Sequence, residues 1–261
     1  MTLIGRTALV TGSVAGLGYG LAEGLAAAGA NVVLNGLCAV EDGRAAADRL
    51  ALDHGVKTGF DPADLSRVDE IEAMMSRTAE TFGGVDIVVN NAVVRHFSPI
   101  EEFAPADWDR SIAVNLTAAF HTARLALPGM KRRGWGRVVN LSSYYGFRGA
   151  ENRIDYVTTK TALIGMTRAI AVETAGSGVT CNALCPGSVL TPAIEARIAG
   201  IAERSGEPAE EVARRYAAER SPMGRFVDTG KLAATLVFLC GAAGDDITGT
   251  VLPVDCGWLA V

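Results

Sequence analysis

The sequence lacks the features that mark several classes of protein. No uninterrupted apolar run approaches the ~20 residues that cross a bilayer, and residues 1–6 lack the charged and apolar regions of a signal peptide. Lys and Arg number 24 against 29 Asp and Glu, so the net charge is -5 and the basic footprint of a nucleic-acid-binding protein is missing. We therefore expect a soluble cytoplasmic protein that engages neither membrane nor nucleic acid.

Paired cysteines are also missing. The five cysteines form an odd set without C-x-x-C spacing, which is typical of buried thiols in a reducing compartment. A metal site at Cys181 and Cys185 is an alternative, but no third or fourth ligand has zinc-like spacing. We favour core packing for these thiols and expect no metal. The five are Cys38, Cys181, Cys185, Cys240 and Cys256.

Glycine, in contrast, is abundant, with 30 of 261 residues against a usual share of roughly 7%. Apolar residues make up 49% and charged residues 20%, close to globular averages, so disorder is disfavoured. The length suits one α/β domain with a large buried core. We predict a single domain over residues 1–261, with many tight turns or close backbone approaches.

Short β-branched runs alternate along the chain with longer segments of helical period. Leu17, Leu21 and Leu25 share one helical face. Strands that are buried on both faces and separated by helices form right-handed crossovers. The predicted fold class is therefore α/β, a single doubly wound parallel sheet of Rossmann-like type with helices on both faces. Strands are expected at residues 7–10, 31–34, 56–60, 85–90, 137–141, 179–184 and 250–254. A second helical face is expected to comprise Trp108, Ile112, Leu116, Phe120 and Ala123.

Residues 188–225 interrupt this alternation. The segment is charged, helical in composition and bounded by Pro192 and Pro222. It is too short for a core of its own. We interpret it as a small helical lid over the substrate and not as a second domain.

A glycine-rich motif, TGSVAGLG, covers residues 11–18 between the first predicted strand and the first helix. Glycines let the backbone turn and approach a pyrophosphate, whose charge is met by the N–H groups at the helix N-terminus. A purely structural turn is the alternative in so glycine-rich a chain, but the strand–glycine–helix context favours a dinucleotide site. The spacing is TGxxxGxG and differs from the standard GxGxxG.

A second candidate site combines Ser143, Tyr156 and Lys160. Tyr156 and Lys160 lie at i and i+4, on one face of a predicted helix. A cation beside a phenol favours the phenolate and lowers a pKa that is normally about 10, which suits a general base. Taken alone, such a pair is more often an ordinary exposed one. Ser143 follows the predicted strand 137–141, at the carboxyl edge where open α/β sheets bind ligands.

Together, and in this order, these motifs resemble the short-chain dehydrogenase/reductase family over the whole chain. The resemblance implies that Tyr156 is the general acid/base and that Ser143 hydrogen-bonds the reacting oxygen. It also implies that Lys160 binds the nicotinamide ribose and lowers the pKa of Tyr156, and that Asn115 positions a water in a proton relay. The family's Asn-Asn-Ala-Gly motif ends in Val93 here, which adds bulk beside the cofactor. The matching residues are Thr11, Gly12, Gly16, Gly18, Asp64, Asn90, Asn91, Ala92, Asn115, Ser143, Tyr156, Lys160, Pro186 and Gly187.

The resemblance also implies a nicotinamide cofactor, with Asp64 at the adenine ring and Asn91 under the adenine ribose. Residues 34–38, after the second predicted strand, include neither an acid for the ribose nor an Arg or Lys. A 2'-phosphate would lack its cationic partner, which favours NAD over NADP. The expected cofactor-binding residues are Gly12, Ser13, Ala15, Gly16, Leu17, Gly18, Asn35, Asp64, Leu65, Asn91, Ala92, Tyr156, Lys160, Pro186, Gly187, Val189 and Thr191.

Within the family the chain most resembles the D-3-hydroxybutyrate dehydrogenases, through residues 28–36, 120–130, 179–187 and 257–260. The pocket departs from that group: Arg95 and Arg197 replace Gln, Arg153 replaces Lys, Tyr145 replaces His and Ser188 replaces Trp. More arginine and less tryptophan predict an anionic substrate larger than hydroxybutyrate, whereas a solvated surface charge is the alternative for each arginine alone. The expected substrate residues are Arg95, His96, Ser143, Tyr145, Arg153, Ser188, Arg197 and Trp258.

These observations predict an NAD-dependent oxidoreductase that transfers a hydride between nicotinamide and a secondary alcohol or ketone. A hydroxy acid or other anionic small molecule related to 3-hydroxybutyrate is the expected substrate. A 3-oxoacyl reductase or a sugar or polyol dehydrogenase is the alternative, and would need few arginines in the pocket. A nucleotide-binding redox sensor would need only the nucleotide half of the motifs. The resemblance implies a homotetramer.

Overall fold

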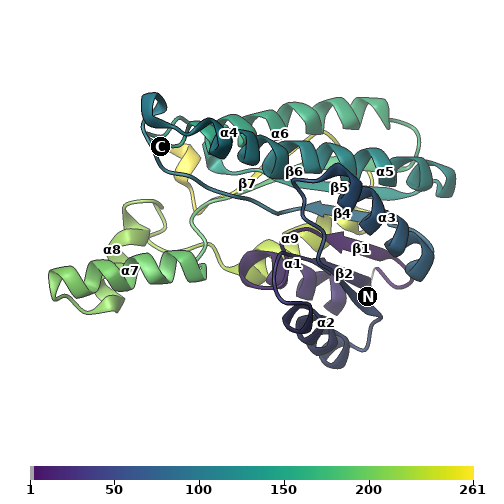
Figure 1. The fold of residues 1–261 in the computed structure, drawn as a ribbon, viewed down its shortest axis with the longest axis horizontal. Coiled ribbons are helices and arrows are strands. Elements are labelled where there is room, and N and C mark those ends of the chain that lie inside the picture. The colour runs from purple at the N-terminus through teal and green to yellow at the C-terminus, as the bar shows by residue number, and fades with distance from the viewer. Residues whose placement is uncertain (1–2) are drawn as a thin grey trace.

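Seven parallel strands form one twisted sheet in the computed structural model, which describes residues 3–261 (Figure 1). The strand order is β3-β2-β1-β4-β5-β6-β7, and every neighbouring pair is parallel. The order reverses between β1 and β4, which opens a crevice at their carboxyl ends. The α/β, Rossmann-like prediction is therefore confirmed. The strands are β1 (Thr7–Val10), β2 (Asn31–Asn35), β3 (Thr58–Asp61), β4 (Ile87–Asn90), β5 (Gly136–Leu141), β6 (Val179–Pro186) and β7 (Val251–Val254).

β1 matches its predicted range, and the other strands differ from the predicted ones by one or two residues at their ends. β3 and β4 each begin two residues later than predicted, and β6 continues to Pro186. The predicted domain over residues 1–261 begins two residues before the first described one. The apolar runs therefore located the strands, whereas their ends depend on pairing with neighbours, which the sequence pattern does not contain.

Two helical layers cover the sheet (Figure 1). Leu21 and Leu25 of the first helix are fully buried in one apolar cluster, as their spacing predicts, and a second cluster fills the opposite face. One layer contains α1 (Gly16–Ala27), α2 (Val40–His54) and α9 (Thr229–Cys240). The other contains α3 (Val68–Phe82), α4 (Pro105–Ile112), α5 (Ala118–Arg133) and α6 (Ile154–Glu173).

The second predicted helical face is wrong in part. Phe120 is 50% exposed, and of the five residues expected on that face only Ala123 is buried. A π-helical turn at Ala113–Thr117 joins α4 to α5. A wider turn of this kind changes the register of the helix, so Ser111, Asn115 and Ala119 face inward in place of the predicted set.

The predicted lid segment, residues 188–225, contains α7 (Pro192–Ser205) and α8 (Ala209–Ala218). The two helices contact each other and project away from the sheet (Figure 1). Val189 and Val227 pair in an isolated parallel bridge, which joins the two ends of the segment at its base. Within residues 3–261, no helix has the length and apolar character to cross a membrane.

Cys181 and Cys185 lie in β6 and are fully buried. Burial raises the pKa of the Cys181 thiol to about 12 and that of Cys185 to about 11. The thiols are therefore protonated at neutral pH, as expected for core residues.

Candidate active site

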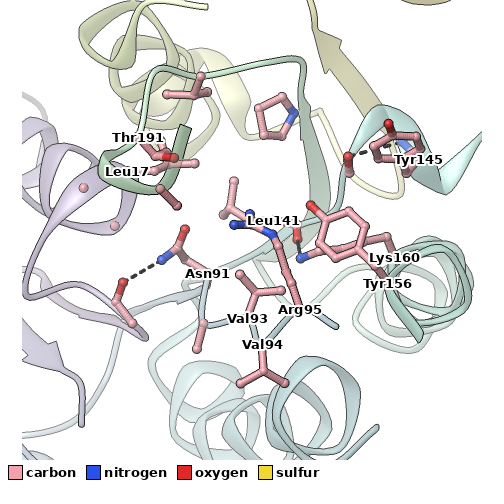
Figure 2. Close-up of a pocket in the computed structure, with 18 of the residues that line it drawn as sticks. Leu17, Asn91, Val93, Val94, Arg95, Leu141, Tyr145, Tyr156, Lys160 and Thr191 are labelled. Carbon is pink, nitrogen blue, oxygen red and sulfur yellow. Dashed lines mark hydrogen bonds between the residues drawn. The ribbon is translucent and has the colours of Figure 1, made fainter. Parts of the chain in front are cut away.

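A cavity of about 1270 Å³ lies at the carboxyl edge of the sheet. It is lined by the β1–α1 turn and by the segments that follow β2 to β6. In Figure 2, Leu17, Asn91 and Thr191 lie on one side of the cavity, and Arg95, Tyr156 and Lys160 lie on the other. Chain segments distant in sequence therefore converge where open α/β sheets bind ligands.

The glycine turn at one end of the cavity is a cradle in which side chains do not fit. A Cβ on Gly12, where φ is +60°, would lie 2.8 Å from the Ala92 Cα, and one on Gly18 would lie 2.1 Å from the Gly12 oxygen. The Asn91 amide donates hydrogen bonds to the carbonyl oxygens of Thr11 (3.0 Å) and Gly12 (2.8 Å), which fixes the turn.

The first helix begins beside this cradle, and its N-terminal N–H groups are available to a ligand. Among the described residues, no side chain caps α1 and its first turn includes no acid. A helix N-terminus of this kind attracts a phosphate through its free N–H groups and its dipole. The turn and the helix together therefore fit the pyrophosphate of a dinucleotide.

Two residues predicted to bind the cofactor use their side chains to hold the turn instead. Ser13 does not line the cavity; its hydroxyl donates to the Val10 oxygen (2.7 Å) and accepts from the Asn35 N–H (3.1 Å). Asn35 does line the cavity, but its amide donates to the carbonyl oxygens of Asp61 (3.1 Å) and Ala63 (3.0 Å). Both side chains are therefore engaged with backbone atoms around the turn.

Tyr156 and Lys160 lie one turn apart on α6, and both are at least nine-tenths buried. The Lys160 ammonium donates a hydrogen bond of 2.5 Å to the Leu141 carbonyl oxygen, and its Nζ lies 5.5 Å from the centre of the Tyr156 ring. Ser143 follows β5 and is also buried; its hydroxyl accepts from the Tyr145 N–H at 3.2 Å. The predicted trio therefore converges on one wall of the cavity.

Burial alone would raise the pKa of the Tyr156 phenol, but the charges around it have the opposite effect. Lys160, Arg95 and the Ser143 hydroxyl favour the phenolate, and the net shift of the pKa is downward. The pKa of Lys160 is lowered, because burial and Arg95 disfavour its charge. A phenol with a lowered pKa in a ligand cavity is a candidate for proton transfer.

Two arginines stand over the Tyr156 ring without an acidic partner. The Arg153 guanidinium lies 4.4 Å from the centre of that ring and 4.3 Å from the Phe97 ring, and the Arg95 guanidinium lies 5.3 Å from the Tyr156 ring. Neither arginine forms an ion pair with any residue from 3 to 261. Within the same range the buried Arg153 Nε has no hydrogen-bond partner.

Most of the other predicted site residues line the cavity as well. The members toward the glycine turn are Ala15, Gly16, Leu17, Asp64, Leu65 and Ala92. The members from the segments after β5 and β6 are Tyr145, Pro186, Gly187, Ser188, Val189, Thr191 and Arg197.

Besides Ser13, three predicted residues lie outside the cavity lining. Asn115 holds the Val94 backbone: its oxygen accepts from the Val94 N–H (2.8 Å) and its amide donates to the Val94 oxygen (3.0 Å). The His96 ring faces Asp155 and Asp107, and Trp258 packs on the Tyr144 ring at 5.4 Å. The rings of His96 and Trp258 therefore pack against protein and lie outside the cavity lining.

The structure adds cavity residues that sequence reasoning missed. Phe97, Tyr144 and Tyr216 bring aromatic rings to the lining, and Arg220 adds a further guanidinium, which pairs with Glu219 at 2.9 Å and stacks on Tyr216 at 3.8 Å. The sequence offers a signal for Phe97: it lies two residues after Arg95, and alternate residues of an extended segment face the same side. Residues of the segment 188–225 carry no such signal.

The chain is similar to known proteins over nearly its whole length. The family described as enoyl-(acyl carrier protein) reductase matches residues 12–259. A D-beta-hydroxybutyrate dehydrogenase from Cupriavidus necator is 45% identical over 259 residues, which cover 99% of each chain, and one from Rhizobium meliloti is 42% identical over 98% of this chain and 99% of its own. The crystal structure of L-sorbose reductase from Gluconobacter frateurii, complexed with NADPH and L-sorbose, has a TM-score of 0.96 at 30% identity, covering 100% of this chain and 99% of the reductase.

The lowered pKa of Tyr156 predicts a direct titration result. Replacing Lys160 by Met removes a cation that favours the phenolate, so the ionisation of Tyr156 moves to higher pH. The ultraviolet absorbance of the phenolate measures this shift, with Tyr156→Phe as the baseline that identifies the signal. The exposed Lys231→Met is the matched control and leaves the titration unchanged. An unshifted titration in Lys160→Met would show that the ammonium does not act on this phenol.

Proposed function

The chain belongs to the short-chain dehydrogenase/reductase family, and from that premise we propose that it is an NAD-dependent dehydrogenase of an anionic secondary alcohol. A hydroxy acid related to 3-hydroxybutyrate is the proposed substrate class. The observation that carries the proposal is a buried Tyr156 with three cations around its ring: Lys160, and Arg95 and Arg153, which form no ion pair within residues 3–261.

Each catalytic side chain has one task in the proposed reaction. Nicotinamide, when bound, supplies the acceptor for the hydride of the alcohol carbon. The Tyr156 phenolate takes the proton of the substrate hydroxyl, and the Ser143 hydroxyl donates a hydrogen bond to the same oxygen. Lys160, held by the Leu141 carbonyl oxygen, favours the phenolate and has the proposed role of binding the ribose. Because the Asn115 amide is engaged with Val94, we propose that it supports this site and does not contact substrate.

The substrate end of the cavity supports an anionic ligand. Two neighbouring guanidinium groups repel each other, and the Arg153 pKa is lowered by burial and by Arg95. A carboxylate between them would relieve that repulsion and supply the partner that the Arg153 Nε lacks. The D-beta-hydroxybutyrate dehydrogenases at 42–45% identity agree with a hydroxy acid. The likeness to L-sorbose reductase favours a neutral polyol as the alternative, which would leave both arginines without a partner.

NAD is the proposed cofactor, although the sorbose reductase neighbour binds NADPH. The end of β2 opens into a stretch, residues 35–43, without Lys or Arg, and α2 begins there with Glu41 and Asp42. These acids would repel a 2'-phosphate. Arg110, which also lines the cavity, is paired with Asp64 at 3.7 Å.

Assembly and cellular location remain proposals. A homotetramer is supported by the family resemblance and by the exposed Phe120 and Phe238, large apolar side chains on helices α5 and α9. The helices α7 and α8 are proposed to close over the substrate as a lid, because Arg197 and Tyr216 of this segment already line the cavity.

Tyr156→Phe tests the proposed chemistry. The substitution keeps the ring and removes the group that exchanges the proton, so turnover falls by about 10² or more. Binding of NADH, measured by fluorescence titration, stays close to that of the native protein. Near-native turnover in this variant would show that Tyr156 is not the base.

The cofactor proposal predicts a higher kcat/KM with NAD than with NADP. Steady-state rates with each cofactor, at one fixed concentration of the alcohol, measure the preference. The double variant Glu41→Gln, Asp42→Asn removes the repulsive charges, so the ratio of kcat/KM with NAD to kcat/KM with NADP falls. A higher kcat/KM with NADP in the native protein would overturn the proposal.

Arg153→Ala and Arg95→Ala test the anionic substrate. A charge-assisted hydrogen bond contributes about 1.5–3 kcal/mol, so each change raises the KM for the hydroxy acid at least about tenfold. The KM for NAD changes little, and Arg153→Lys restores only part of the loss, since a point charge lacks the planar fork. Arg148→Ala, an exposed arginine outside the cavity lining, is the matched control. Normal KM values in both alanine variants would favour the neutral-alcohol alternative.

A further inference from the structure

The residue before Tyr156, Asp155, has a fully buried carboxylate. It is the second residue of α6, and its Oδ1 accepts a hydrogen bond of 2.6 Å from the Tyr156 N–H. That bond would suffice for an acid that only stabilises the start of a helix. The second oxygen, however, turns away from α6 toward two other elements, so the carboxylate has a further task.

The Asp155 Oδ2 joins α6 to α4 and to the segment after β4. It accepts from the Ser111 hydroxyl of α4 at 2.8 Å and from the His96 N–H at 3.3 Å. The His96 Nδ1 also lies 3.3 Å from this oxygen, and the His96 Nε2 lies 3.5 Å from the exposed end of Asp107. A buried carboxylate is costly unless such donors surround it. The network therefore fixes three elements at one point.

These contacts bracket Arg95 from both sides. The preceding residue, Val94, is held at its N–H and its carbonyl oxygen by the Asn115 amide, and the following residue, His96, is held by Asp155. The backbone of Arg95 is thereby fixed, while its side chain extends to 5.3 Å from the Tyr156 ring (Figure 2). One carboxylate therefore holds the Tyr156 N–H and the residue that follows Arg95.

We propose that Asp155 is a positioning residue, which holds Arg95 over the Tyr156 phenol through its hydrogen bonds to His96 and Ser111. The proposal rests on the proposed function, because it assigns Arg95 to the substrate anion. Arg95 has two effects that depend on its position: it binds the anion, and it favours the phenolate. If Asp155 no longer holds the segment, both effects of Arg95 weaken together.

Asp155→Asn tests this positioning role. The amide keeps the shape of the carboxylate, but its nitrogen cannot accept from Ser111 or His96. We expect the KM for the hydroxy acid to rise about fivefold or more, with the KM for NAD within about twofold of native. In the pH profile of kcat/KM for alcohol oxidation, the acidic limb moves to higher pH. The reason is that a phenol without the nearby Arg95 charge needs a higher pH to ionise. The other groups that face the phenol are Lys160, Arg153, Ser143 and Tyr145.

A double-mutant cycle with Arg95→Ala separates positioning from general destabilisation. If Asp155 acts through Arg95, then adding Asp155→Asn to Arg95→Ala changes the KM by less than about twofold. The acid dissociation constant read from the acidic limb also changes by less than about twofold. Ser111→Ala removes one donor and leaves the carboxylate in place, so it gives a smaller shift in the same direction and serves if Asp155→Asn does not fold. Asp109→Asn, an exposed acid of α4, is the matched control with native kinetics.

The outcomes distinguish this inference from the proposed function. Native KM and pH profile in both Asp155→Asn and Ser111→Ala, with Arg95→Ala impaired, would overturn the positioning role and leave the proposed function intact. If the effects of Asp155→Asn and Arg95→Ala on KM multiply in full in the double variant, the positioning role is also overturned. Native behaviour of Arg95→Ala itself would remove Arg95 from the proposed substrate site, and this inference would fall with it.

Discussion

The site depends on two opposing effects on the pKa of a single phenol, Tyr156: burial raises it and nearby positive charges lower it. Tyr156 is almost completely buried, which by itself favours the neutral form, yet its pKa is lowered because Lys160 and Arg95 lie against the ring. Both cations are in turn held by the fold: Lys160 by the Leu141 carbonyl at the end of β5, and Arg95 by a segment fixed after β4. The sheet edge therefore sets the chemistry, because it determines how close these charges come to the phenol.

The same concentration of positive charge limits what the cavity can bind. Arg95, Arg153 and Lys160 gather around the Tyr156 ring, and neither arginine forms an ion pair with an acid among residues 3–261. Burying unbalanced charge is costly, and the aromatic rings of Phe97 and Tyr156 stabilise the guanidinium of Arg153 only in part. An anionic ligand resolves this imbalance, whereas a neutral polyol does not. The electrostatics thus connect the catalytic phenol to the choice of substrate.

Sequence reasoning reached the parts of the molecule that short motifs encode. The glycine turn could be predicted because only glycine tolerates the close approach of Ala92, and Tyr156 and Lys160 because their spacing matches one helical turn. It failed where packing decides. The inward face of α5 was mispredicted because the π-helical turn shifts the register. The network around Asp155 was not predicted, because it joins segments whose proximity exists only in the fold.

The most direct test of the central claim compares an acid with its neutral counterpart. With NAD present, kcat/KM is measured for 3-hydroxybutyrate and larger hydroxy acids, and for the amides of the same carbon skeletons. The amide keeps the size and the reacting alcohol but removes the charge. We expect the best acid to exceed its amide by at least about tenfold, the contribution of one charge-assisted hydrogen bond. Equal or higher kcat/KM for the amides would contradict an active site built around an anionic substrate.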